Sequence, residues 1–272
     1  MTVTLADQHG EMIVAAVRAA VPDLDDPVLF LAGSMVDGLA NDGSDLDVYL
    51  VAAAGVTGTA TTSRRREKNG TIGLLESREI NLSILDPAAL TELATSFAGC
   101  LASITGDGGI AQLDSENDLK VLHRIRTGQP LLGATGLRRW GVDLGCDRLD
   151  AYLANLHGVT ALNRARDVQG ELSAGRMESA GWMLREALVH TGQLALALGG
   201  ETNPSRKWLV RLLRRPGAHQ ESRDWVADRL VAAAPDLPTD LTLLTARLRT
   251  LVEAAPDGVV GPYLRRLARG PA

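Results

Sequence analysis

The chain has 272 residues, of which 45% are apolar and 22% charged, and its formal net charge is −5. This composition is typical of a globular protein and excludes the disordered and fibrous classes. At roughly 100–200 residues per domain, the length predicts two domains, each able to bury a core of its own.

Charge or glycine interrupts the apolar runs every few residues, and the first residues lack a basic start followed by a long apolar stretch. This pattern argues against a signal peptide and against a membrane span. We therefore expect a cytoplasmic protein. Cys100 and Cys146 lie in separate segments without metal-ligand spacing. We therefore expect neither a disulfide framework nor a zinc site.

Charge is distributed unevenly along the chain. Residues 1–110 carry 15 acids and 6 bases, whereas residues 111–272 carry 18 acids and 22 bases. The second part is too weakly basic for a nucleic-acid footprint, which argues against a nucleic-acid partner. It can still supply a few cations to a phosphate ligand.

The first 110 residues mix helical and strand patterns. Apolar residues recur at helical spacing from Ala6 to Val21, and Pro87 is placed to begin a helix that ends near Leu101. The residues between 53 and 70 are small, polar and basic, which predicts a surface loop or hairpin. Short apolar or alternating runs predict four strands, over residues 28–32, 45–51, 71–75 and 79–85.

The pattern from residue 114 onward is helical. Helices are predicted over residues 116–126, about 145–172, about 177–198, 206–213 and 225–233, with two more near the end. Glycine-rich breaks at 106–109 and 128–136 are candidate boundaries. The sequence thus predicts an α/β domain with a small mixed sheet over residues 1–110, followed by an all-α helical bundle over residues 111–272.

Two acids on the second predicted strand carry the first chemical signal. Residues two apart on a strand share a face, so Asp45 and Asp47 point the same way while Leu46, Val48 and Leu50 point into the core. The two carboxylates repel each other unless a divalent cation binds between them. Oxygen ligands of this kind suit Mg²⁺, which completes its shell with water and substrate phosphates.

Two further features belong with this pair. Gly33 and Ser34 end the first predicted strand, where a glycine allows close approach of the backbone to an anion. Glu79 lies on a later strand, on the face opposite to Ile80 and Leu82. We therefore expect three acids to be able to meet around one metal centre.

The segments 33–39 (GSMVDGL) and 44–48 (SDLDV) resemble the Gly-Ser…Asp-x-Asp signature of the polymerase-β-like nucleotidyltransferase superfamily. The closest resemblance is to aminoglycoside adenylyltransferases of the streptomycin and spectinomycin type, in which a Glu heads a later strand and a helical domain follows. The motif covers about 55 residues, and the remainder is similar only in architecture. By this resemblance, residues 1–110 would be the catalytic domain and residues 111–272 a helical domain that binds substrate or nucleotide.

The resemblance implies a set of site residues. Asp45, Asp47 and Glu79 would be catalytic and would ligate two Mg²⁺ ions, with Glu79 as the general base. Gly33 and Ser34 would bind the triphosphate of ATP or another nucleoside triphosphate. The segment 203–208 (NPSRKW) resembles a Lys-plus-Trp segment of the helical domain, which makes Lys207 and then Arg206 candidates for nucleotide binding.

One position leaves an alternative open. Members of the superfamily outside the adenylyltransferase group have an Asp as the third acid, and a register shifted by two would place Asn81 there. An Asn can neither take a proton nor carry charge.

The implied function is transfer of a nucleoside monophosphate, AMP from Mg-ATP, to a hydroxyl of a small molecule such as an aminoglycoside or a related natural product. Pyrophosphate is the second product. Two alternatives remain: a nucleotidyltransferase that acts on a macromolecule, either tRNA or a protein, and a non-catalytic nucleotide-binding scaffold. Fold analogy alone does not supply a substrate.

Overall fold

A computed structural model describes residues 5–21, 26–53, 69–75, 78–232 and 236–270. The loop predicted over residues 53–70 lies, apart from its ends, outside the described residues. The chain divides into two compact units. The sheet unit comprises residues 1–98 and 114–147, and the helical unit comprises residues 99–113 and 148–272.

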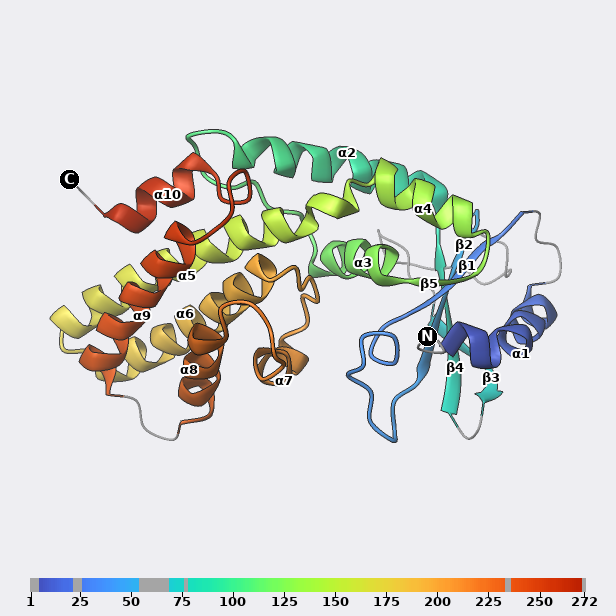
Figure 1. Cartoon of the computed structure of the whole chain (residues 1–272), viewed down its shortest axis with the longest axis horizontal. Coiled ribbons are helices and arrows are strands. Elements are labelled where there is room, and N and C mark those ends of the chain that lie inside the picture. The colour runs from blue at the N-terminus through green and yellow to red at the C-terminus, as the bar shows by residue number, and fades with distance from the viewer. Residues whose placement is uncertain (1–4, 22–25, 54–68, 76–77, 233–235, 271–272) are drawn as a thin grey trace. The chain divides into compact units, whose positions relative to one another are not determined.

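The sheet unit contains a five-stranded mixed sheet with the strand order β3-β4-β2-β1-β5 (Figure 1). Strand β2 pairs with β4 in parallel, and the other pairings are antiparallel. The strands are β1 (Val28–Ala32), β2 (Leu46–Val51), β3 (Asn69–Leu75), β4 (Arg78–Leu85) and β5 (Gln129–Leu132). The helices assigned to this unit, wholly or in large part, are α1 (Leu5–Ala20), α2 (Pro87–Ile104), α3 (Glu116–Thr127) and α4 (Ala134–Asp143).

One face of the sheet packs on α1. Ile13 and Val17 of this helix are buried against alternate residues of the strands, including Leu31, Val48 and Ile80. On the other face Phe30 stacks on Tyr49, with ring centroids 5.3 Å apart. The predicted alternation of core and opposite-face residues in β2 and β4 is confirmed, and the apolar run of residues 28–32 forms the buried strand β1.

The helical unit is a bundle in which α5, α6 and α9 contact one another (Figure 1). Its elements are the 3-10 turns η1 (Cys146–Arg148, partly in the sheet unit) and η2 (Arg206–Trp208), with α5 (Leu149–Ser173), α6 (Met177–Leu198), α7 (Leu209–Leu213), α8 (Gln220–Val231), α9 (Leu237–Glu253) and α10 (Pro262–Arg269). The predicted fold class, an α/β domain with a small mixed sheet plus a helical bundle, is confirmed.

The division differs from the predicted boundary after residue 110. Residues 114–147, expected in the bundle, belong to the sheet unit because β5 pairs with β1 and α3 and α4 contact β1. Residues 99–113 belong to the helical unit instead. There Tyr152 donates a hydrogen bond to the Ala111 carbonyl (3.1 Å) and accepts one from the Leu113 N–H (3.3 Å).

Asn155 on α5 organises the end of the helical unit. It has no exposed surface, its Nδ2 donates to the Val259 carbonyl (2.7 Å), and its Oδ1 accepts from the Gly261 N–H (2.8 Å). A Cβ on Gly261 would overlap the backbone oxygen of Ile104. The segment before α10 is therefore held by both polar pairing and close backbone contact.

Helix α2 is long and apolar enough to cross a membrane by length and composition alone, in contrast to the expectation from the sequence. Length and composition alone are weak evidence of a membrane span, because core helices of globular proteins can have both. Its buried residues Leu90, Leu93, Phe97, Cys100 and Ile104 recur at steps of three and four. That stripe is the pattern of a helix packed on a protein core.

Candidate active site

The two aspartates lie at the start of β2, on the sheet face opposite to α1. Leu46, Val48 and Leu50 belong to the core beneath α1, so the side chains of Asp45 and Asp47 project from the other face. Asp45 is exposed and Asp47 is half-buried. The predicted common face of these two carboxylates is therefore present in the structure.

Gly33 lies directly against Asp47. Ala32, the last residue of β1, pairs with Asp47 across the sheet, and the chain then turns at Gly33 with φ of +85°. A Cβ at Gly33 would overlap the Asp47 carboxylate oxygen Oδ2, and L side chains disfavour this φ. Only glycine fits here, and it brings the backbone before Ser34 close to a carboxylate.

Ser34 begins a compact turn. The Gly33 carbonyl accepts from the Asp37 N–H (2.9 Å), and the Ser34 carbonyl accepts from the Leu39 N–H (2.8 Å). Asp37 is anchored in turn by His123 of α3, whose Nε2 lies 3.1 Å from the Asp37 Oδ2. The His123 side chain is 5% exposed and the Asp37 side chain 10%. The turn that carries Ser34 is therefore fixed to the helix that follows it much later in the sequence.

Arg78 holds the next loop in place. Its Nη1 donates to the carbonyls of Asn41 and Ser44, both at 3.0 Å. The Ser44 hydroxyl donates to Asn41 Oδ1, also at 3.0 Å. These contacts fix the backbone immediately before Asp45. Sequence reasoning missed Arg78, Asp37 and His123, because their partners are 34 to 86 residues away and no local pattern reveals them.

Asn81 is hydrogen-bonded to Asp45, whereas Glu79 contacts Thr71. Asn81 pairs with Asp47 in the parallel ladder, and its Nδ2 donates to Asp45 Oδ2 at 2.7 Å. Glu79 is exposed, as predicted from the face opposite Ile80, and its Oε2 lies 3.3 Å from the hydroxyl of Thr71 on β3. Glu79 precedes Asn81 by one strand repeat, roughly 6.5–7 Å.

Thr71 links the two side chains. Its Oγ1 lies 3.3 Å from Glu79 Oε2 and 3.1 Å from Asn81 Oδ1. A hydroxyl has one hydrogen, so it donates to one of these acceptors at a time. The result is a polar row of Glu79, Thr71, Asn81 and Asp45 along this face. Within the described part of the chain, no group of three or more His, Cys, Asp or Glu is placed to hold a metal ion.

The other two predicted residues belong to the helical unit. Arg206 contacts both carboxylate oxygens of Glu186 (3.3 Å each), and its Nη2 lies 3.4 Å from His190 Nε2. Lys207 is exposed, with its ammonium 4.5 Å from the centroid of the Trp208 ring. A role of either residue in nucleotide binding stays a prediction.

The half-buried His190 pairs with the buried His157, and the other ring nitrogen of His190 faces Arg206. Their Nδ1 atoms are 3.0 Å apart. Burial, with the other histidine and Arg206 adding to it, lowers the pKa of His157 to about 3. The pKa of His190 is lowered to about 4, chiefly by burial and then by the positive charge of Arg206. Glu186 raises this pKa and Arg164 lowers it further. Both rings are therefore neutral at pH 7.

We expect this pair to make the helical unit sensitive to acid. In the unfolded chain each histidine takes up a proton near pH 6.5, whereas in the folded chain it does so only near pH 3 to 4. The stability contribution is present above pH 6.5 and is lost as the pH falls from there towards 4. Urea unfolding between pH 7 and 4 measures it.

The control for this expectation is His157→Gln, which removes one of the titrating groups. The variant should show a shallower loss of unfolding free energy over that pH range than the parent protein. If the unfolding free energies of the variant and the parent fell equally with pH, groups other than this pair would produce the acid sensitivity.

Comparison with family models and with curated proteins yields no match. Among solved structures, the chain is similar to a nucleotidyltransferase-like protein from Exiguobacterium sibiricum, with 14% sequence identity and a TM-score of 0.45. The likeness covers 91% of this chain and 74% of that one. Roles for individual residues of this chain therefore follow from its own geometry.

Proposed function

We propose that this protein transfers a nucleoside monophosphate, AMP from Mg-ATP, to a hydroxyl group of a small molecule and releases pyrophosphate. The observation that carries the proposal is the Asp45–Asp47 pair, which shares one sheet face and lies against the Gly33 turn at Asp47. The Gly-Ser…Asp-x-Asp resemblance and the acceptor class of the similar adenylyltransferases support the choice of reaction and substrate.

The donor set fits Mg²⁺. Asp45 and Asp47 offer carboxylate oxygens, and the missing side chain at Gly33 leaves the space that the Asp47 carboxylate itself occupies. Hard divalent cations prefer such oxygen ligands and leave positions for water and phosphate. When bound there, Mg²⁺ would neutralise charge on the triphosphate and on the leaving pyrophosphate.

The remaining steps fall to side chains of this face. The turn at Ser34 would position the phosphates, and Glu79 would take the proton of the acceptor hydroxyl. The hydroxyl oxygen forms a bond to the α-phosphorus while the bond from that phosphorus to the oxygen bridging to the β-phosphate breaks. The electron pair of the broken bond leaves with pyrophosphate, and the Thr71 hydroxyl lies 3.3 Å from the Glu79 carboxylate.

The test is pyrophosphate release from each of the four nucleoside triphosphates with Mg²⁺, with and without a panel of aminoglycosides. We expect release that depends on both ATP and an acceptor. Glu79→Gln should lower it by roughly a hundredfold or more, the usual contribution of a positioned base. Glu92→Gln, which removes an exposed carboxylate on α2, is the matched control and should be as active as the parent.

A second candidate is a nucleotide-binding protein without turnover. One observation favours it: the residue beside Asp45 is Asn81, which cannot accept a proton. Under this candidate ATP binds in a Mg²⁺-dependent manner, no acceptor elicits pyrophosphate release, and Asn81→Asp creates activity by adding a third carboxylate. Under the first candidate, the parent protein is active and loses activity with Glu79.

A further inference from the structure

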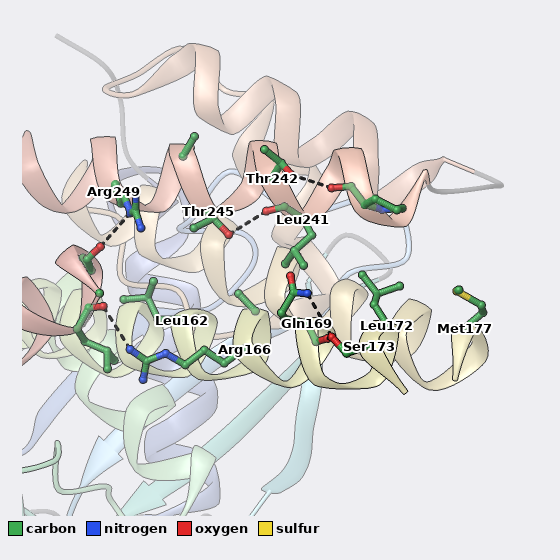
Figure 2. Close-up of a pocket in the computed structure, with 16 residues that line it drawn as sticks. Leu162, Arg166, Gln169, Leu172, Ser173, Met177, Leu241, Thr242, Thr245 and Arg249 are labelled. Carbon is green, nitrogen blue, oxygen red and sulfur yellow. Dashed lines mark hydrogen bonds between the residues drawn. The ribbon is translucent and has the colours of Figure 1, made fainter. Parts of the chain in front are cut away.

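The helical unit contains a pocket that is lined by none of the candidate residues for nucleotidyl transfer. It encloses about 870 Å³ between α5, α9 and the end of α10 (Figure 2). That volume lies within the range of small-molecule sites, roughly 300–1,000 Å³. Nine of its lining residues are apolar: Leu162, Ala165, Leu172, Met177, Pro238, Leu241, Ala246, Leu267 and Ala268.

Two arginines line the end of this pocket that lies beside the last turn of α10. Arg166 comes from α5 and Arg249 from α9, and Figure 2 shows their guanidinium groups at the same end of the pocket but apart from each other. Arg166 Nη2 lies 3.5 Å from the Leu267 carbonyl, and Arg249 Nε donates to the Ala268 carbonyl at 3.1 Å. Each guanidinium has five N–H groups, so most of its donors remain for a further acceptor.

The charge around this end is positive. The residues that line the pocket include no Asp or Glu, and within the described residues neither Arg166 nor Arg249 forms an ion pair. The carboxyl end of α10 contributes the equivalent of about half a negative charge, which two full positive charges exceed. Arg269, in the last turn of α10, adds another positive charge.

The opposite end combines the apolar Leu172 and Met177 with Gln169 and Ser173, whose side chains lie 3.5 Å apart. Figure 2 shows Leu172 and Met177 away from the two guanidinium groups, and Met177 is 56% exposed. Between the ends, the hydroxyls of Thr242 and Thr245 already donate to carbonyls of their own helix. A ligand that matches this layout has one anionic group for the arginines and an apolar body.

We propose that this pocket binds a small amphipathic anion, with a carboxylate or phosphate headgroup held by Arg166 and Arg249 and an alkyl or aryl body along α5 and α9. Planar guanidinium groups pair with either headgroup through two parallel hydrogen bonds. The proposal is independent of the nucleotidyl-transfer proposal, because every residue of the pocket belongs to the helical unit and none is a candidate for the transfer reaction.

The test is calorimetric titration of the full chain with decanoate, decyl phosphate and the neutral decanol. We expect at least one of the two anions to bind about tenfold or more tightly than decanol, and the comparison of the two identifies the headgroup. Raising the salt concentration should weaken the preferred anion and leave decanol unchanged. Failure of both anions to bind more tightly than decanol overturns the proposal.

Three variants complete the experiment. The double variant Arg166→Gln, Arg249→Gln should lose the preference for the anion, whereas Arg139→Gln, an exposed arginine of the sheet unit, should keep it. Because the double variant also removes contacts to the end of α10, Ala246→Trp provides a second route: it keeps both arginines, places a large side chain in the lining of the pocket and should abolish binding of the anion. Undiminished anion binding by either pocket variant would place the ligand elsewhere.

Discussion

Replacing Asp47 by Asn is expected to lower acceptor-dependent pyrophosphate release by roughly a thousandfold or more. The substitution keeps the shape of the side chain but removes the negative charge that would hold Mg²⁺. Stabilisation of phosphoryl charge by such an ion is worth several kcal/mol, and each factor of ten in rate corresponds to about 1.4 kcal/mol. The fold should persist, since Asp47 is only half-buried and its ladder pairs use the backbone.

Binding offers a readout of the same substitution that needs no acceptor. Titration of the parent protein with ATP should show tighter binding in the presence of Mg²⁺, and Asp47→Asn should lose that difference. Asp42→Asn, which neutralises an exposed acid in the preceding loop, is the matched control. If Asp47→Asn retained turnover and metal-dependent binding, the metal assignment would be wrong.

Asn155→Ala is expected to reduce the free energy of unfolding of the helical unit by about 3 kcal/mol or more. The substitution leaves the Val259 carbonyl and the Gly261 N–H without their partner in a buried location, and each unsatisfied group costs about 1–3 kcal/mol. Chemical denaturation followed by circular dichroism measures the change. Asn163→Ala, an exposed asparagine on the same helix, should change the free energy by less than about 0.5 kcal/mol.

A small effect of Asn155→Ala, close to that of Asn163→Ala, would contradict this expectation. It would mean that the segment before α10 is held by the packing of Gly261 on the Ile104 backbone and not by the amide of Asn155.

The elements found by sequence reasoning are those with strong apolar periodicity. Strands β1, β2 and β4 and helices α3, α5 and α6 appear close to the predicted bounds. Helix α8 was predicted to start at Trp225 but begins at Gln220, because its first turn is polar and carries no periodic signal. The predicted helix over 206–213 divides into η2 and α7.

The predicted break at residues 128–136 was wrong, and its glycines explain why. The four-residue strand β5 contains Pro130 and lies at the edge of the sheet, where a missing N–H is tolerated. Gly136 lies inside α4, where a Cβ would collide with the side chain of Val28. Here the glycine permits close packing of a helix on a strand. From the local sequence alone, the same glycine indicates a loop.

Local sequence patterns likewise predict only part of the candidate site. The common face of Asp45, Asp47 and Glu79 follows from strand alternation alone, and the structure agrees. The neighbour of Asp45 does not follow from it, because it depends on parallel pairing of β2 with β4 across 36 residues. Local patterns therefore find the acids, whereas their partners Asn81, Thr71 and Arg78 require the topology.

The placement of β5 sets an order on folding during synthesis. Strand β1 pairs on one side with β2 and on the other with β5, whose residues are made about a hundred positions later. Until residue 132 has left the ribosome, the outer edge of β1, including Leu29 and Leu31, lacks its partner strand. Unpaired apolar edges of this kind attract other chains. A shortened chain ending at residue 110 is thus expected to aggregate, although it carries every acid of the candidate site.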